Sequence, residues 1–364
     1  MQSARQFVFV GCLNRPAPYF APPRGRGIAV LSFDPETGAL QQVSEVNDVD
    51  NPTFLAVSVA RRTLYATSEV FGWREGVVSA YAIGEDGSLS YINKQPTRGS
   101  LAAHAAIDPS GSWLIVTNYQ LGLDGTRPSY AVVTFPIEPD GGLGPPAGGV
   151  FHNGSGPARD RQERAHPHCA LPTPDGSHVL VSDLGIDRII VYRFCGARGH
   201  LRRVSDVSLP EGCGPRHLAW ARPGVVVATG ELDNTTMSLA WNGASLRLLS
   251  VAPLLPAKFL GESHAADIHA APDGRYVYAS NRGGDSIATL SVDESGRLSP
   301  SSHRRTGRTP RNFTLDQSGR HVLVACQDGH EVIVHRRDNE TGALSEPIGR
   351  VGMGSPMCVK IAAL

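Results

Sequence analysis

Two histidines stand one residue apart directly before an alternating apolar run, in the stretch QERAHPHCALPTPDGSHVLVSDLGIDR at residues 162–188. Imidazoles in such a pair act as metal ligands, as general acids or bases, or as ordinary turn residues. The neighbouring sequence supplies no third ligand of clear spacing to His166 and His168. All three roles stay open, with a catalytic or substrate-contacting role favoured for His168, and no metal site is predicted.

Other side chains that bind or activate a carbonyl group recur at the ends of short apolar runs. Arginine grips carboxylate and phosphate through paired N–H groups, whereas glutamate and histidine exchange protons with a substrate. One such residue is explained at least as well by pairing between neighbouring strands, but a convergent set favours a functional site. The candidates besides the histidine pair are Glu69, His104, Asn118, Arg216, His217, Glu231, Arg282, Arg311 and Gln327.

The apolar runs that carry these residues have the length and composition of β-strands. They are rich in Val, Ile, Tyr and Phe, and clusters of Gly, Pro, Asp and Ser separate them. Long amphipathic helix patterns are missing, and 40 glycines and 27 prolines make the chain dense in turns. The pattern indicates an all-β protein. No Walker or Rossmann motif is present, and no cofactor is predicted.

One unit recurs: a strand, a turn of the type Asp-Pro-Ser-Gly, a second strand that ends in a polar residue, then a third and often a fourth strand. Clear copies are HAAIDPSGSWLIVTNY from His104 and DIHAAPDGRYVYASNRGGD from Asp267. Each unit is typical of a four-stranded meander. The units start near Thr53, Ala103, His168, Arg216, Ala266, Arg311 and Met357, in steps of about 45 to 50 residues with one of about 65.

The two ends of the chain hold complementary parts of one more unit. The last copy, MCVKIAAL, is a lone strand, and the residues before Thr53 hold three strands, FVFVGCL, IAVLSFD and LQQVSEV. Joining them completes a seventh blade and leaves no sheet edge open. The sequence therefore predicts a single seven-bladed β-propeller domain over residues 1–364, with the last blade closed by the C-terminal strand and the N-terminal strands.

The repeat also predicts where the candidate residues meet. The start of the first strand and the end of the second lie on the same face of a blade, so two columns of residues should surround one mouth of the channel. The first column is Thr53, His104, His168, Arg216 with His217, Asp267, Arg311 with Asn312, and Met357. The second is Ser68 with Glu69, Asn118 with Tyr119, Asp183, Glu231, Asn281 with Arg282, and Gln327.

A glycine-rich segment, HNGSG, followed by Arg161 and Gln162, leads into the histidine pair. It is a cover for the channel mouth, an anion-binding loop or an ordinary connector between blades, and the sequence favours none of the three. The opposite mouth consists of the Asp-Pro-Ser-Gly turns, whose residues are explained by backbone geometry. The polar mouth is therefore the predicted site.

The charge pattern excludes two classes of partner. Lys plus Arg and Asp plus Glu number 34 each, and neither sign gathers in a run, so no surface for nucleic acid or an anionic membrane is indicated. Small-molecule or protein partners remain.

The chain is expected to be soluble and cytoplasmic. Its first residues, MQSARQFVFVGCLN, hold an apolar stretch of about four residues, against the roughly 7 to 15 of a signal-peptide core. No later segment has the length of a membrane span. Six cysteines lie far apart without a CxxC pair, which favours buried, reduced thiols.

Four segments resemble the propeller lactonase family, which includes bacterial 6-phosphogluconolactonase and fungal carboxy-cis,cis-muconate cyclase. They are FHNGSGPARDRQERAHPH (151–168), GPRHLAW (214–220), ADIHAAPDGRYVYASNRGGDSI (266–287) and TPRNFTLDQSGRHVLVA (309–325). The resemblance covers the whole chain in register with the repeats, and it implies a seven-bladed propeller. By motif, the cyclase branch implies site roles for His168, Arg216, Glu231 and Arg282.

The chain departs from the family pattern at two places. Gly230 stands where the family usually has asparagine before the glutamate, after a hairpin one residue shorter, which puts the placement of Glu231 in doubt. The stretch YQLGLDGTRPSYAVVTF after Asn118 is longer than usual and is positioned to reshape the mouth and the choice of substrate.

The resemblance implies an enzyme that hydrolyses a sugar-acid lactone such as a 6-phosphogluconolactone-like aldonolactone. Opening a lactone requires a base for the attacking water and a cation or donor for the developing oxyanion. The candidate base is Glu231 or His168, and the candidate oxyanion partner is Arg216 or Arg282. Arg311 is a further candidate for binding a phosphate or carboxylate of the substrate. Two alternatives stay open: a carboxymuconate-type lactonising cyclase, which needs the same residue types, and a non-catalytic binding scaffold.

Overall fold

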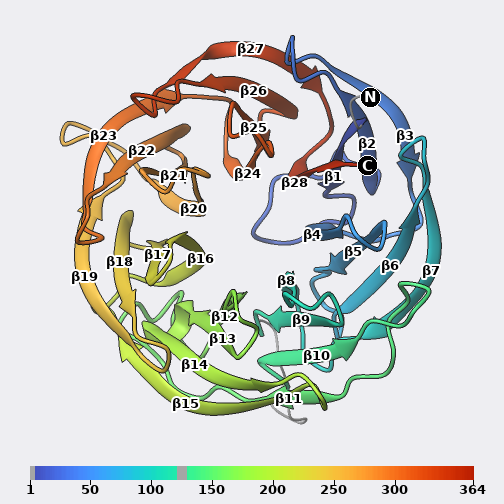
Figure 1. Cartoon of the computed structure of the whole chain (residues 1–364), viewed down its shortest axis with the longest axis horizontal. Coiled ribbons are helices and arrows are strands. Elements are labelled where there is room, and N and C mark those ends of the chain that lie inside the picture. The colour runs from blue at the N-terminus through green and yellow to red at the C-terminus, as the bar shows by residue number, and fades with distance from the viewer. Residues whose placement is uncertain (1–4, 121–128) are drawn as a thin grey trace.

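The structure is a computed structural model that describes residues 5–120 and 129–364. In these residues the chain forms 28 β-strands and one short 3₁₀ helix, η1 (Leu184–Ile186). The strands make seven four-stranded antiparallel sheets, which stand around a central channel as the blades of a propeller (Figure 1). The prediction of an all-β, seven-bladed fold is confirmed.

Each blade runs from the channel outward. The innermost strands are β4 (Pro52–Ser58), β8 (Ala102–Ile107), β12 (Pro167–Pro172), β16 (Pro215–Arg222), β20 (His264–Ala270), β24 (Pro310–Leu315) and β28 (Pro356–Ala363). The second strands are β5 (Thr63–Ser68), β9 (Trp113–Asn118), β13 (His178–Asp183), β17 (Val225–Gly230), β21 (Tyr276–Arg282), β25 (His321–Cys326) and β1 (Gln6–Cys12).

The outer half of each blade follows the same order. The third strands are β6 (Val77–Ile83), β10 (Val132–Pro136), β14 (Arg188–Cys195), β18 (Thr235–Trp241), β22 (Ser286–Val292), β26 (Glu331–Arg337) and β2 (Ile28–Phe33). The outermost are β7 (Leu89–Pro96), β11 (Gly148–Val150), β15 (His200–Ser208), β19 (Leu246–Pro253), β23 (Leu298–Arg305), β27 (Leu344–Gly352) and β3 (Leu40–Val46).

One blade joins both ends of the chain and closes the ring. Its strand order is β28-β1-β2-β3, and Val10 of β1 pairs with Val359 of β28 in antiparallel register. The first and last strands, β1 and β28, accordingly lie side by side in Figure 1. The closure is the predicted one, and the innermost strands begin within two residues of the predicted starts.

The hydrophobic core lies between neighbouring blades. One cluster joins Tyr65 and Val78 of the β4–β7 blade to Leu114 and Phe135 of the next blade, all fully buried. Burying such a side chain stabilises the fold by about 1.5 to 3 kcal/mol. The hydroxyl of Tyr65 also donates a 3.0 Å hydrogen bond to the carbonyl of Gly141, which satisfies its polar end and ties the two blades.

The turns at one end of the blades are held by their own aspartates. The carboxylate of Asp108 accepts hydrogen bonds from the backbone N–H groups of Ser110, Ser112 and Trp113. Gly111 in this turn has φ of 67°, a conformation that glycine adopts without strain. The Asp-Pro-Ser-Gly sequence thus has a local backbone role, as the repeat predicted.

The cysteines form no disulfide. All six are free, and Cys195 is the exposed one while the others are buried. The predicted pattern of mostly buried, unpaired thiols is confirmed. No helix in the described part of the chain is long and apolar enough to cross a membrane.

Candidate active site

Every innermost strand carries a β-bulge at the same end. A regular strand points successive side chains to opposite faces, whereas a bulge inserts residues that have no partner and re-aims their side chains. The residues that the register skips are Thr53, Ala103, His168, Arg216 with His217, Ala266 with Asp267, Arg311 and Met357. They match the predicted first column except that Ala103 is skipped in place of His104, Ala266 is skipped together with Asp267, and Asn312 is paired. The bulges explain how the side chains of two consecutive polar residues, such as Arg216 and His217, can both face the channel.

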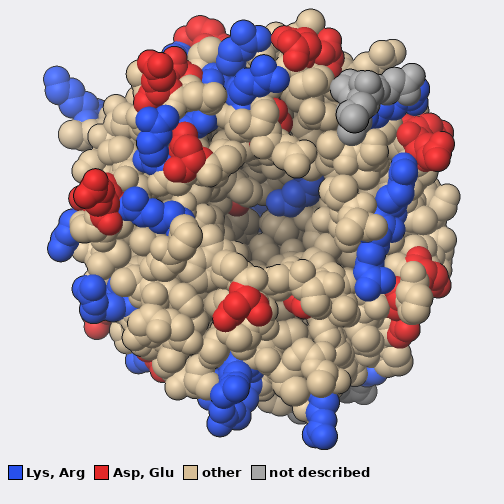
Figure 2. Space-filling view, viewed as in Figure 1, with Lys and Arg blue, Asp and Glu red and all other residues tan. Residues whose placement is uncertain are grey.

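A cavity of about 420 Å³ lies at this mouth. The channel through the centre of the ring is visible as a hollow on the face of the molecule that Figure 2 shows. Both predicted columns reach it, and loops complete its wall. The lining residues are Tyr19, Phe20, Glu69, Ala103, Tyr119, Asp160, Arg161, Glu163, His166, His168, Glu231, His264, Arg282 and Arg311. This volume suits a small molecule of the size of a sugar derivative.

Glu231, the residue after β17, is the charge centre of the cavity. Its Oε1 lies 2.5 Å from Nη2 of Arg161, and its Oε2 lies 2.9 Å from Nε of Arg216 and 3.0 Å from Nη2 of Arg282. Burial raises the pKa of Glu231, but Arg282, Arg161 and Arg216 outweigh burial and hold the pKa well below its usual range. Glu231 is therefore a permanent carboxylate that neutralises part of an arginine cluster.

His168 is a buried imidazole in the cavity wall. Its Nδ1 has no hydrogen-bond partner in the described part of the chain, and the residue is 6 % exposed. Burial, followed by the charges of Arg216 and His217, lowers the pKa of His168 well below its usual value. A histidine with this environment keeps a lone pair available at neutral pH, which is the property of a general base.

His166 is committed to positioning a cavity wall. Its Nδ1 donates a 2.7 Å hydrogen bond to the carbonyl of Tyr119, its Nε2 lies 3.0 Å from Oε2 of Glu163, and its ring stacks on Tyr119 at 4.4 Å. Both ring nitrogens thus have protein partners. Within residues 5–120 and 129–364, no group of three or more His, Cys, Asp and Glu is placed to hold a metal ion.

Arg311 lines the cavity without a direct ion pair to a described carboxylate, although its charge acts on Glu69 nearby. Its guanidinium lies 4.8 Å over the ring of Phe20, and no carboxylate of the described residues lies within ion-pair distance of it. Glu69 lines the same cavity and accepts a 2.7 Å hydrogen bond from the hydroxyl of Thr53, while burial raises its pKa. Arg311 is thus free to pair with an anion that enters from solvent.

The loop before β12 is folded onto the mouth by buried contacts. The side-chain amide of Gln162 donates to the carbonyl of Leu184 and to Asp187, each at 2.8 Å, and Gln162 is fully buried. A Cβ at Gly185 would lie 1.8 Å from the carbonyl oxygen of Arg164, so this close approach requires glycine. The loop thereby carries Arg161 to Glu231, which makes it part of the cavity wall.

Five predicted site residues lie outside the cavity wall. The ring of His104 packs at a tilt against Phe54, with centroids 4.1 Å apart, and Asn118 donates its amide hydrogens to the carbonyls of Thr97 and Tyr130. Because residues alternate along β9, Asn118 turns into the blade and Tyr119 takes the cavity position. The amide of Gln327 donates to Asp328 next to it.

Arg216 and His217 lie directly behind the wall. Arg216 reaches Glu231 from the channel side, and His217 packs beneath His168 with ring centroids 5.2 Å apart. The six other predicted residues, Glu69, His166, His168, Glu231, Arg282 and Arg311, line the cavity. The shorter hairpin and Gly230 do not displace Glu231 from the site, since its carboxylate reaches Arg161, Arg216 and Arg282.

Sequence reasoning missed the lining residues contributed by loops. Tyr19 and Phe20 come from the segment between β1 and β2, Asp160 and Glu163 from the loop before β12, and His264 from the first position of β20. None of them occupies a repeated position, so periodicity gave no signal. Of the long stretch expected to reshape the mouth, residues 121–128 lie outside the described part of the chain.

Known proteins resemble this chain over nearly its whole length. A family model described as a lactonase with a seven-bladed β-propeller matches residues 7–361. A 6-phosphogluconolactonase of Bacillus subtilis is 32% identical over 340 residues, which are 92% of this chain and 94% of that protein.

Two solved structures share the architecture. A putative 6-phosphogluconolactonase from Bacteroides fragilis superposes with a TM-score of 0.87 at 28% identity, covering 99% of this chain and 98% of that one. A periplasmic gluconolactonase from Pseudomonas aeruginosa superposes with a TM-score of 0.89 at 29% identity, covering 99% of this chain and all of that one.

Proposed function

The chain belongs to the seven-bladed β-propeller lactonase family, and we propose that it hydrolyses a sugar-acid lactone in the cavity lined by His168 and Glu231. The observation that carries the proposal is a neutral, buried imidazole facing the same cavity as an arginine cluster that one carboxylate only partly neutralises. The names of its relatives, 6-phosphogluconolactonase and gluconolactonase, support this class of substrate.

The proposed reaction assigns the base to His168. Water adds to the lactone carbonyl carbon while a ring nitrogen of His168 accepts its proton. The carbonyl oxygen becomes an oxyanion, which Arg282 and Arg161 stabilise from the cavity wall. The ring carbon–oxygen bond then breaks, and the protonated His168 returns the proton to the leaving ring oxygen. The products are a carboxylate and a hydroxyl, with one net proton released at neutral pH.

In this scheme Glu231 positions the guanidinium groups and does not accept the proton. Its low pKa makes it a weak proton acceptor, so of the two bases that the sequence offered, His168 is preferred. By pairing with Arg161 and Arg282, Glu231 keeps both guanidinium groups at the wall where charge develops. Three arginines around one carboxylate leave net positive charge for the oxyanion and for the carboxylate product.

Arg311 is proposed to bind a phosphate or another anionic group of the substrate. It lines the cavity, and its guanidinium lies against Phe20 and forms no direct ion pair with a carboxylate of the described residues. Guanidinium binds phosphate oxygens through two parallel N–H groups, a geometry that suits a phosphorylated aldonolactone.

The test is acid release from a panel of lactones with and without phosphate, at a pH low enough to slow spontaneous hydrolysis, together with cis,cis-muconates followed by ultraviolet absorbance. Turnover of a lactone that is lost in His168→Ala supports hydrolysis by this site. Turnover of a muconate alone favours the cyclase reaction, and folded protein that acts on nothing in the panel favours a binding scaffold.

We also propose that the protein works in a reducing compartment, the cytoplasm. Six free cysteines in one chain fit such a compartment, because oxidising compartments favour disulfides. Fractionation of cells followed by detection of the protein tests this, and recovery from the periplasm contradicts it.

A further inference from the structure

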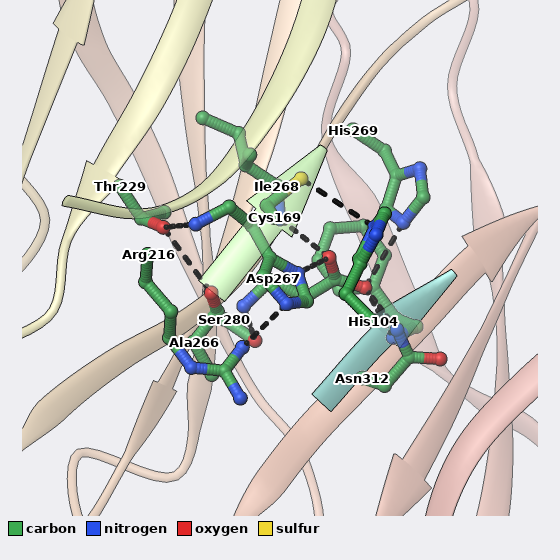
Figure 3. A network of polar contacts seen from close by, with 12 residues as sticks. His104, Cys169, Arg216, Thr229, Ala266, Asp267, Ile268, His269, Ser280 and Asn312 are labelled. Atoms are coloured by element: carbon green, nitrogen blue, oxygen red, sulfur yellow. Dashed lines mark hydrogen bonds and ion pairs between the residues drawn. The ribbon is translucent and has the colours of Figure 1, made fainter. Parts of the chain in front are cut away.

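A buried polar network surrounds Asp267 and extends to Arg216, which pairs with Glu231 of the cavity wall (Figure 3). Nη1 of Arg216 lies 3.1 Å from Nε2 of His217, and Nδ1 of His217 lies 2.6 Å from Oδ1 of Asp267. The three residues are at most 4 % exposed, and they come from the bulges of β16 and β20. Together with Glu231 they form a chain of polar contacts, Asp267–His217–Arg216–Glu231, that ends at the cavity wall.

Asp267 is the fixed end of this line. Besides His217, its carboxylate accepts hydrogen bonds from the side chains of His269 and Asn312 and from the backbone N–H groups of Ile268 and Phe313. Burial raises the pKa of Asp267, but the partner histidines and hydrogen bonds hold it well below its usual range. A buried carboxylate with so many donors has one orientation and stays ionised.

The tautomer of His217 follows from this geometry. Because the Asp267 carboxylate only accepts, Nδ1 of His217 carries the proton, and Nε2 of the neutral ring presents its lone pair. That lone pair is the acceptor for Nη1 of Arg216. Nε of Arg216 forms the ion pair with Glu231 without a suitably directed hydrogen bond, so among the described residues His217 provides the directed anchor of this guanidinium.

We propose that His217 and Asp267 are positioning residues of the lactone site: Asp267 selects the Nδ1–H tautomer of His217, whose Nε2 fixes Arg216 against Glu231. The proposal rests on the proposed hydrolysis. Oε2 of Glu231 is shared by Arg216 and Arg282, so a displaced Arg216 lets the carboxylate shift and carries Arg282 away from the substrate carbonyl. Neither His217 nor Asp267 lines the cavity, so both act through Arg216 and Glu231.

The same network also fits a purely structural role, and the test must distinguish that role from the positioning of Arg216. Asn312 bonds Asp267 through its amide and accepts a 2.7 Å hydrogen bond from the backbone of Val359, so the network links β16, β20, β24 and β28. In the structural role His217 only ties two blades, and what matters is its donation to Asp267.

Two substitutions of His217 each keep one of its two hydrogen bonds and remove the other. Glutamine places a side-chain amide near the position of Nε2 and offers an acceptor to Arg216. Asparagine places its amide near the position of Nδ1 and offers a donor to Asp267 but nothing to Arg216. The positioning role therefore predicts that His217→Gln keeps kcat within about threefold, whereas His217→Asn lowers kcat about 10- to 100-fold, as loss of an orienting partner does.

KM should change little in either variant, because neither residue contacts bound substrate. His104→Gln is the matched control, since His104 lies in the channel with its ring centroid 5.5 Å from that of His217 and has no bond to Arg216. The control should retain kcat. Retained kcat in His217→Asn with a loss in His217→Gln overturns the proposal in favour of the structural tie.

A second measurement does not depend on turnover. In protein labelled with ¹⁵N in histidine side chains, His217 should show a protonated Nδ1 and an unprotonated, hydrogen-bonded Nε2, and Asp267→Asn should abolish that pattern. An Nε2-protonated His217 in the wild-type protein overturns the positioning role even where hydrolysis is observed. If no lactone is hydrolysed, the proposed function fails, and these ¹⁵N signals alone decide whether Asp267 and His217 anchor Arg216.

Discussion

Nη2 of Arg161 lies 2.5 Å from Oε1 of Glu231, which joins the loop before β12 to the end of β17 across the channel mouth. The pair is unequal in exposure, since the Glu231 side chain is 4 % exposed and that of Arg161 is 38 % exposed. Glu231 therefore depends on its arginines to be charged, whereas Arg161 remains partly in contact with solvent.

Glu231→Gln should destabilise the protein and reduce turnover together. The variant leaves Arg216 and Arg282 buried beside a neutral amide, and loss of one partner from a buried ion pair costs about 3 to 5 kcal/mol. Chemical denaturation measures the free energy of unfolding, and acid release measures kcat. Glu163→Gln is the control, because that carboxylate also lines the cavity but is 36 % exposed and should cost far less. Equal losses in both variants contradict the central role of Glu231.

His168→Ala should lower kcat while leaving the fold intact. General-base catalysis contributes about 10²- to 10⁴-fold, and the substitution removes the group to which that role is assigned. Nδ1 of His168 has no partner in the described residues, so its removal leaves no broken hydrogen bond there. Initial rates on the preferred lactone and the melting temperature are the measurements. Unchanged kcat in His168→Ala would show that another residue of the cavity is the general base.

Activity should persist at pH values below the usual titration of histidine. The pKa of His168 is held well below its ordinary value by burial, so its neutral, basic form survives as pH falls through 6.5. We expect the acidic limb of the kcat/KM profile to lie below that pH, measured after subtraction of the uncatalysed rate. An acidic limb at 6.5 or above indicates a different base or a more hydrated His168.

Stability should fall as pH is lowered from 6.5 towards 4. Burial, then Arg216, lowers the pKa of His217 from 6.5 to about 4, so the unfolded chain binds a proton in this window that the folded protein does not. The contribution of His217 to the free energy of unfolding is therefore complete above pH 6.5. Below that pH it decreases by about 1.4 kcal/mol per pH unit for each such histidine. Urea denaturation at a series of pH values measures the slope. The slope should be shallower in His217→Gln, and an unchanged slope assigns the pH dependence to other groups.

Arg311→Ala should discriminate between phosphorylated and plain lactones. Loss of a charge-assisted hydrogen bond costs about 1.5 to 3 kcal/mol, which corresponds to a rise in KM of about 10- to 150-fold for the substrate that uses it. Steady-state kinetics on a matched pair of lactones measures the ratio. Arg308→Ala is the control, because Arg308 precedes β24 and lies outside the cavity wall. Equal losses on both lactones show that Arg311 does not bind the phosphate.

Much of the fold was predictable because its signals are local. The strand–turn–strand repeat, its spacing and the split copy at the chain ends together specify seven blades and their closure through β28 and β1. Turn residues such as Asp108 and Gly111 act on their own backbone, so a short stretch of sequence is enough to read them. Six of the eleven predicted site residues line the cavity. Five of them, all but His166, stand in the two columns, which follow from strand order alone.

What tertiary structure decided is which side chain at each mouth position faces the substrate. A bulge, not simple alternation, turns Arg216 and His217 together into the channel, and alternation along β9 gives the wall position to Tyr119 in place of Asn118. Arg161, Tyr19 and Phe20 reach the cavity on loops whose paths depend on contacts far along the chain, such as that of Gln162 with Leu184. The sequence by itself determined the ring and the residue types at its mouth. Only the packed structure decided that Glu231 is a shared anion for three arginines and that the pKa of His168 is low, because both states arise from burial and from charges on other blades.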